Sequence, residues 1–587
     1  MLTATDERPS LTDPATTWER RLLLWALPLM LVLAALDAAV LRPGFSAYDE
    51  ESQLDLIQAW REGMPLQWRY AFGCVHRAMI AGLFGALGPN EAWLRLPAML
   101  ALVLQVILLF AWLKPRLGER AALWACLADL VCTATFANAR SMVSPSMLSA
   151  VFLAHAVVLE RLRRPWHHAL FGLSLILWTL DYEGWLVALT WLLLAWAWST
   201  RRAPDKGWRW AGLLLGLGAG AAWVVHLSPS FGDYAVTRVG VSGPRQGVLA
   251  LAWDNLTELL GHGHRLAFSA ADLHPWPGPW IWPLCLAGAL PLWRRFRAAW
   301  GLVLVGSAPL VLQLTSEEPH RMALALLGLA AMAGAGAAWL WRYKVAQVAL
   351  PLLLVAGAGY EGWAWTHNKL HVAYAYGRSQ NLEAAARWMK AAQGAQGWEL
   401  LDGLGPYNDG SFRLLLDLRR VPHQGGTPVA LVHWDYLPAL KGLKGQVIAM
   451  DSSDYLPLYL YLPAPDELPR LRALHQELAP LQRLSLSAYP LRLQEAALAR
   501  LHDRTLTDPW ARTVYWEAWM HANMMLNTAD PAMAKAAARE PLVSGWAFDA
   551  LAHGLEEKLP QVAQAFYDRA DAADPRRASL PYRYLRY

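Results

Sequence analysis

Three acidic residues in a row, Asp49, Glu50 and Glu51, closely follow the first apolar run of the chain. A carboxylate that is held at a reaction site can act as a general acid or base. Acidic residues are also favoured at the start of a helix, where Asp caps free backbone N–H groups and negative charge complements the helix dipole. Catalysis and helix capping are therefore two competing interpretations of this cluster.

A second pair of acids, Asp181 and Glu183, lies between two short apolar runs, 168–180 and 184–198. Each run is shorter than the roughly 20 residues that a bilayer crossing needs. Ionisable groups at membrane depth usually face a protein-lined cavity, so we expect these carboxylates to line the same cavity as Asp49. The alternative is that the ends of the two runs are misassigned.

The remaining metal-ligating residue types give little support for a metal site. His262, His264 and His274 fall in one stretch, but no neighbouring acid or cysteine completes a recognisable ligand set. The chain has only four cysteines, without paired zinc spacing or a disulfide framework. We therefore expect no cofactor, and a divalent metal, although not excluded, is not indicated.

The composition is that of a membrane protein. Of 587 residues, 55% are hydrophobic and 17% are charged, which is too apolar for a single water-soluble core. The net charge of +5 is mild and the basic residues stand between apolar runs, which excludes a nucleic-acid-binding protein. The first run, 22–41, is long enough to span a bilayer and lacks a cleavage pattern, so we expect it to be retained.

The apolar runs predict a polytopic α-helical membrane protein with about 11 spans. If the N-terminus is cytoplasmic, the short cytoplasmic loops hold 15 Lys and Arg residues and the short outer loops hold two. This bias fixes the orientation, and an odd number of spans exports the C-terminal part. The predicted spans are 22–41, 94–113, 121–138, 143–159, 168–180, 184–198, 210–228, 279–293, 299–314, 322–341 and 345–365.

Three domains follow from this pattern: a transmembrane domain at 1–365, an exported α/β domain at 366–490 and an exported helical domain at 491–587. Within the first, the outer loop 42–93 is predicted to contain two amphipathic helices. The last domain resembles a tetratricopeptide-type bundle, although no 34-residue repeat is visible, and its helices offer a surface for a protein partner. Predicted helices cover 50–62, 72–85, 382–392, 511–523, 531–538 and 559–572, and predicted strands cover 398–401, 428–433 and 446–450.

Several short motifs occur in order along this topology. The pair Asp49-Glu50 is followed by Gly63 and an aromatic stretch to Tyr70, then by Leu94-Arg95-Leu96-Pro97. Ala139-Arg140 and Pro319-His320-Arg321 come later in the chain. Over residues 18–365 the chain resembles the C-type-fold membrane glycosyltransferases that use polyprenyl-phosphate sugars, such as the protein O-mannosyltransferases and the lipid A aminoarabinose transferases.

This resemblance implies an inverting transfer of a sugar, hexosyl or pentosyl, from a polyprenyl-phosphate donor to an acceptor hydroxyl on a glycan, lipid or protein. The setting would be the outer face of a bacterial inner membrane, with the C-terminal part in the periplasm. Asp49 would be the general base and Glu50 would orient it or the acceptor. Arg95 and Arg321 could equally reach lipid headgroups from helix ends. The donor and its phosphate would be bound by Arg95, Arg140, Asp181, Glu183, His320 and Arg321.

The chain departs from the family at two places, which leaves a changed donor or a changed role open. It reads Ser144-Pro145-Ser146 where members carry an acid, and it has Asp181 to Glu183 where many place a lysine. The enzymatic alternative is an oligosaccharide ligase or block transferase. The non-catalytic alternatives are an assembly scaffold and a transporter, although the repeated halves typical of transporters are not evident.

Overall fold

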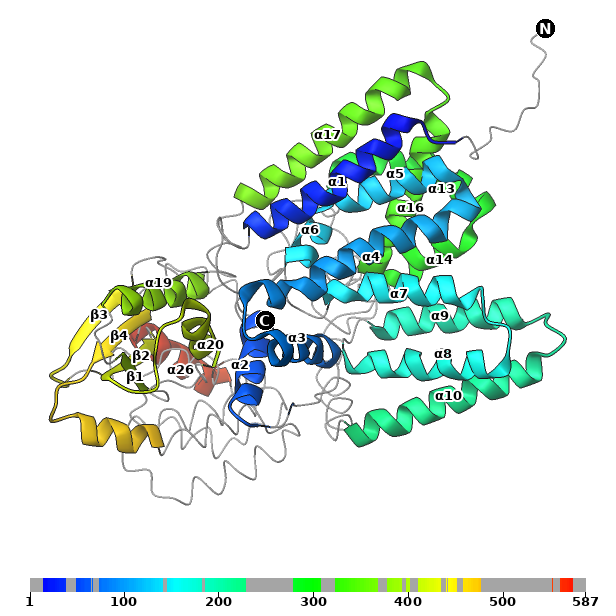
Figure 1. The fold of residues 1–587 in the computed structure, drawn as a ribbon. Helices are drawn as coiled ribbons and strands as arrows, with labels where there is room; N and C mark the ends of the chain where they lie inside the picture. Colours follow the sequence, from blue (N-terminus) through cyan, green and yellow to red (C-terminus); the bar gives the residue numbers. More distant parts are fainter. Residues whose placement is uncertain are drawn as a thin grey trace, which may run out of the picture.

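The fold consists of a body of long helices and a small sheet flanked by helices, with two loop helices between them (Figure 1). Residues 14–37, 49–64, 66, 73–140, 145–181, 185–227, 278–307, 323–367, 377–392, 397–401, 410–433, 440, 442–450, 458–476, 552 and 560–573 are described by this computed structural model. The statements that follow concern these residues.

Each predicted span coincides with at least one helix of the structure, although the described residues Cys132, Ser307 and Trp341 inside three of the spans are not helical. By length and composition, α4, α10, α16 and α17 are able to cross a membrane, while the total of about 11 spans remains a prediction. The helices of this body are α1 (Thr17–Leu36), α4 (Glu91–Leu117), α5 (Glu119–Val131), α6 (Thr133–Arg140), α7 (Pro145–Leu159), α8 (Pro165–Leu177), α9 (Trp185–Thr200), α10 (Lys206–Leu227), α13 (Trp282–Arg295), α14 (Arg297–Gly306), α16 (Ala323–Leu340) and α17 (Lys344–His367), with one-turn helices η2 (Trp178–Leu180) and η4 (Pro279–Ile281).

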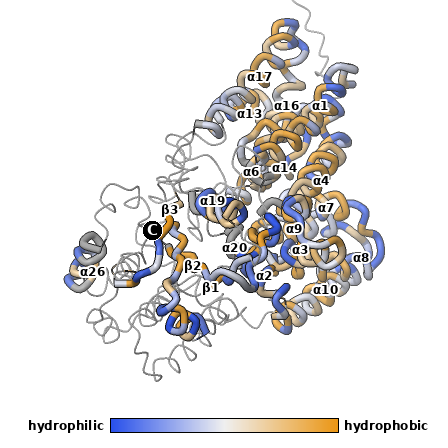
Figure 2. The backbone as a smooth tube through the Cα atoms, turned by 60° about the vertical axis from the view of Figure 1, so that its left-hand side comes forward, coloured by the Kyte–Doolittle hydropathy of each residue, from blue (hydrophilic) through white to orange (hydrophobic). Residues whose placement is uncertain are grey.

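The helices of this body consist mostly of hydrophobic residues, as the hydropathy colouring in Figure 2 shows. On α10, for example, Leu214, Leu215 and Val225 are exposed. Contiguous apolar surface of this extent needs an apolar surrounding. The helical body therefore suits a membrane location.

Glycines allow α8 and α10 to pack closely. A Cβ added to Gly216 would lie 1.9 Å from the Ala169 carbonyl oxygen, and one added to Gly212 would lie 2.3 Å from that of Pro165. Gly212, Gly216 and Gly220 are spaced four residues apart on α10, the small-residue pattern that lets membrane helices approach closely. The two helices are therefore joined by backbone contact rather than by large side chains.

A buried ion pair joins α1 to α5. The Arg120 Nε atom lies 3.1 Å from Glu19 Oε1, and Glu19 has no exposed surface. The Trp124 indole N–H donates to the same carboxylate oxygen at 3.0 Å. On its other side Glu19 completes a capping box with Thr16 at the start of α1. The charge of Glu19 is thus compensated within the protein.

One predicted span, 121–138, is two helices in the structure. The chain leaves α5 at Cys132, which has extended backbone angles, and α6 begins at Thr133. The Glu361 carboxylate of α17 accepts the Thr133 backbone N–H at 3.1 Å, and Trp280 Nε1 donates to Glu361 at 2.9 Å. The break arises because a distant carboxylate caps the second helix, which the apolar pattern cannot reveal.

The sheet has the strand order β1-β2-β4-β3. Strands β1 and β2 are parallel and are linked through α20, whereas β4 pairs antiparallel with both β2 and β3. The three predicted strands are confirmed, but β4 was not recognised as a strand from the sequence. The elements are α19 (Gly377–Ala391), β1 (Trp398–Leu401), α20 (Gly410–Arg419), β2 (Thr427–His433), β3 (Gln446–Met450) and β4 (Leu458–Leu462).

Towards the C-terminus, α26 (Pro560–Ala573) confirms the predicted helix at 559–572. The predicted helices at 511–523 and 531–538 lie outside the described residues. The domain boundaries at 366 and 491 remain predictions.

Candidate functional site

Two helices, α2 (Asp49–Arg61) and α3 (Cys74–Leu87), form the loop that carries the acidic cluster. Both were predicted, with nearly these bounds. Asp49 is the first residue of α2, and Glu50 follows in the same turn; the side chains of both lie outside the described part of the structure. Leu54 and Ile57 are fully buried, so α2 is anchored by one apolar face.

Asp181 caps the start of α3 from a distant part of the chain. Its Oδ1 atom accepts the backbone N–H groups of Val75 and His76, both at 3.0 Å, and its own carbonyl oxygen accepts the Gly73 N–H at 2.6 Å. Gly73 has φ of +67°, a left-handed conformation that suits glycine. Burial raises the pKa of the Asp181 carboxyl to about 6, against the opposing effect of the two N–H groups and of Arg77. The turn after η2 is thereby fixed to the loop helices.

The Arg77 side chain links α3 to α2. Arg77 is 1% exposed, and its Nη1 atom donates to the Gln53 Oε1 atom at 2.7 Å while Nη2 lies 3.5 Å from the Cys74 sulfur. Neither ring nitrogen of the neighbouring His76, which is also buried, has a hydrogen-bond partner among the described residues. Arg77 and His76 were not among the predicted site residues. The available signal was an arginine inside an otherwise apolar helix, since arginine is seldom fully buried without a specific role.

Two of the predicted cations lie on described helices. Arg95 on α4 is 4% exposed, so its side chain faces the protein interior and does not reach towards headgroups. Arg140 ends α6, but its side chain lies outside the described part. Asp129 on α5 supports α6 through the Thr135 hydroxyl at 3.3 Å and accepts Gln105 Nε2 at 2.7 Å. Glu183, His320 and Arg321 lie outside the described residues.

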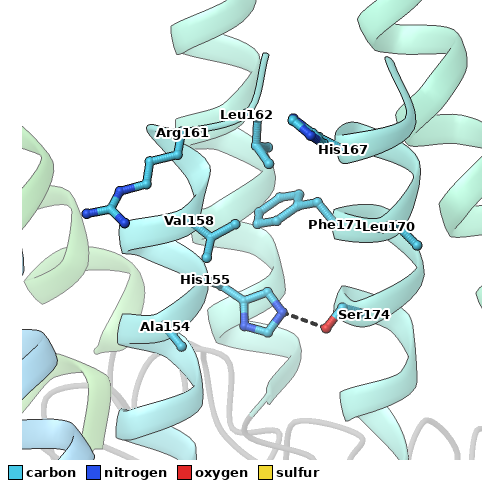
Figure 3. Close-up of a pocket in the computed structure, with 9 residues that line it drawn as sticks. All are labelled: Ala154, His155, Val158, Arg161, Leu162, His167, Leu170, Phe171 and Ser174. Carbon is cyan, nitrogen blue, oxygen red and sulfur yellow. Dashed lines mark hydrogen bonds between the residues drawn. The ribbon is translucent and has the colours of Figure 1, made fainter. Parts of the chain in front are cut away.

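An apolar groove of about 450 Å³ lies between α7 and α8 (Figure 3). One polar pair in its lining is internally satisfied, because His155 Nε2 lies 2.9 Å from the Ser174 hydroxyl and His155 Nδ1 lies 2.8 Å from the Val151 carbonyl oxygen. Arg161 and His167 also line the groove, near the loop that joins the two helices. The groove lies along α8 away from the η2 end, where Asp181 stands, so we separate it from the acidic loop.

Within the described ranges, no group of three or more His, Cys, Asp or Glu residues could hold a metal ion. His262, His264 and His274 lie outside those ranges. The described part of the candidate site consists of carboxylates, buried arginines and helix termini.

No protein-family model and no curated protein matches the sequence. Among solved structures, ArnT from Cupriavidus metallidurans bound to undecaprenyl phosphate has a TM-score of 0.45 and 16% identity, covering 77% of this chain and all of that one. The Archaeoglobus fulgidus oligosaccharyltransferase in its apo form has a TM-score of 0.42 and 12% identity, covering 65% of this chain and 59% of that one. The archaeal oligosaccharyltransferase AglB from the same organism, in complex with an inhibitory peptide and a dolichol-phosphate, has a TM-score of 0.40 and 11% identity, covering 93% and 87%. All three TM-scores are below 0.5.

Proposed function

We propose that this protein is an inverting membrane glycosyltransferase that transfers a sugar from a polyprenyl-phosphate donor to an acceptor hydroxyl. The acceptor oxygen attacks the anomeric carbon, the bond from that carbon to the phosphate oxygen breaks, and the polyprenyl phosphate leaves with the electron pair. A base must take the hydroxyl proton, and cations must stabilise the charge on the leaving phosphate. The reaction takes place at the outer face of the bacterial inner membrane.

The observation that carries this proposal is the link from Gln53 on α2 through Arg77 on α3 to the helix start held by Asp181. Gln53 is four residues after Asp49, and positions four apart share one face of a helix. A buried guanidinium thus lies on the helix face that includes position 49. The transfer step requires an acid and a cation close to each other, and this helix face provides both.

In the proposed site, Asp49 takes the proton and Glu50 orients it or the acceptor. Arg77 joins Arg95, Arg140, His320 and Arg321 as a candidate for contact with the donor phosphate, because a guanidinium presents a rigid fork of donors. Asp181 acts as a positioning residue, and Glu183 as a further candidate for donor binding. No metal or other cofactor has a role in this scheme.

The test is the Asp49→Asn variant. Asp49 is the first residue of α2, where loss of its negative charge near the helix dipole costs only about 0.3 to 1 kcal/mol, so α2 and the expression level should be retained. Loss of a general base typically costs about 10² to 10⁴ in rate, so transfer from a polyprenyl-phosphate sugar should fall by that factor. Glu50→Gln, a matched neutralisation one residue further on, should cost less. Transfer at the wild-type rate by Asp49→Asn would return the cluster to a capping role.

A further inference from the structure

The sheet segment comprises the elements from α19 to β4. The start of one of its helices, α20, packs directly against α2. Asp55 Oδ1 accepts the Ser411 backbone N–H at 2.5 Å, so an acid of α2 caps α20. Gly410 makes this approach possible, because a Cβ there would lie 3.1 Å from the Asp55 Cα atom. The contact joins residues 356 positions apart in sequence.

Two ion pairs of opposite polarity continue the contact. Arg61 Nη1 on α2 lies 2.6 Å from Asp417 Oδ2, and Arg413 Nε on α20 lies 2.7 Å from the Oε1 atom of Glu62, just after α2. Arg413 and Asp417 are four residues apart and share one face of α20. Gln58 connects the two pairs by accepting from Arg61 and donating to Glu62. This alternation of sign specifies one register between the helices.

Apolar packing lies behind the charges. Leu54 and Ile57 of α2 belong to the same buried cluster as Phe412, Leu415 and Leu416 of α20. Ile80 and Phe84 of α3 and Leu94 of α4 are members too, as are residues of all four strands. Exposed ion pairs alone contribute little to stability, but here they flank an apolar core that fixes their geometry.

A third charged link ties the same region to the membrane body. Arg419 at the end of α20 donates at 2.9 Å both to Glu383 on α19 and to Glu91 at the start of α4. Burial lowers the pKa of Arg419, but the hydrogen bonds and charges of the two glutamates outweigh it and raise the pKa overall. The sheet and its helices are thus attached both to α2 and to the start of α4.

We propose that α20 sets the orientation of α2, and with it the acidic cluster at the start of α2, and that the paired residues Arg61 and Asp417 are positioning residues for the transfer reaction. The sheet segment is then a working part of the site. The claim that these residues affect the transfer reaction rests on the proposed function. The claim that α20 orients α2 does not. Misplacement by about 1 Å can cost about 10²-fold in rate, so the expected effect is on kcat.

The experiment is a charge swap in the full chain. Arg61→Asp and Asp417→Arg are made singly and together, with Lys390→Glu on an exposed part of α19 as a control for the charge change in Arg61→Asp. Hydrogen–deuterium exchange of residues 49–61 should be faster in each single variant, unchanged in the control, and restored in the double variant. Asp417→Asn removes the charge without reversing it and should give an intermediate effect. It provides the test if a charge reversal prevents folding.

Transfer kinetics are measured on the same proteins. We expect kcat to fall at least tenfold in the single reversals, with KM changed little, and to recover in the double variant. If hydrogen–deuterium exchange is unchanged in the single variants, or is not restored in the double variant, the contact between α2 and α20 does not orient α2. Faster exchange with an unchanged kcat would overturn the positioning role. If the wild-type protein transfers no sugar, the proposed function fails while the exchange result still decides the contact.

Discussion

Asp181 and His76 are joined by a hydrogen bond of 3.0 Å from the backbone N–H of His76 to the Asp181 carboxylate, across 105 residues of sequence. A carboxylate that follows a short apolar helix thus supplies the N-cap of a loop helix. The acids between the two short runs were expected to line a cavity shared with Asp49. For Asp181 the structure describes a capping contact instead, while the cavity itself stays a prediction.

Asp181→Ala should loosen the start of α3. Loss of an N-cap side chain typically costs about 1 kcal/mol, and removing the negative charge near the buried Arg77 adds to that cost. Cys74 opens this helix and is buried, so its rate of thiol labelling, located by mass spectrometry, reports the opening. Labelling of Cys74 should be fastest in Asp181→Ala and intermediate in Asp181→Asn, which keeps an acceptor but removes the negative charge near Arg77. Equal rates in all three proteins would mean that the cap is not needed.

Gly216→Ala should destabilise the pair of helices α8 and α10. Its Cβ would lie 1.9 Å from a backbone oxygen, and overpacking typically costs about 1 to 3 kcal/mol. Gly218, two residues on, has open space around it, so Gly218→Ala should be neutral or slightly stabilising because alanine favours a helix. Thermal unfolding in detergent compares the two. A lower midpoint for Gly218→Ala than for Gly216→Ala would contradict the packing described.

Glu19→Ala should be strongly destabilising. It leaves the largely buried Arg120 without its carboxylate, and breaking a buried pair by removing one partner costs about 3 to 5 kcal/mol. The matched control is Glu119→Ala, which breaks the Arg20 pair at 2.9 Å on an exposed surface and should cost at most about 1 kcal/mol. Denaturation of the purified variants measures both. Similar losses in the two proteins would show that burial of the first pair is energetically unimportant.

Protease added to intact spheroplasts should digest the chain beyond about residue 366. The expectation rests on the 15 to 2 bias of Lys and Arg between the short loops. The N-terminal 17 residues should be protected until lysis, which provides an internal control. Protection of the C-terminal part in intact cells would reverse the orientation and place α2 and its acids in the cytoplasm.

Apolar runs of 13 to 21 residues were sufficient to locate the helices, because each run leaves a local mark in the sequence. The same is true of α2 and α3, whose buried residues recur at helical spacing. Contacts between distant segments leave no such mark. The cap on α6 from Glu361 and the cap on α3 from Asp181 connect residues 228 and 105 positions apart, and neither was predicted.

The candidate site shows the same division. Its acids were found because they stand together in sequence, whereas Arg77 was missed because its role depends on Gln53 and Asp181. Strand β4 was missed because Leu458 to Leu462 is a short apolar stretch between prolines, a composition typical of loops as well as of strands.

The apolar cluster between α20 and the helices α2 and α3 means that neither side is a separate module. A gene truncated near codon 366 would encode the predicted spans complete, yet Leu54, Ile57, Ile80 and Phe84 would lose the residues that cover them. Such a fragment would expose an apolar patch to water and would aggregate or be degraded. The sheet segment and the loop helices must therefore be inherited, shuffled or transplanted together.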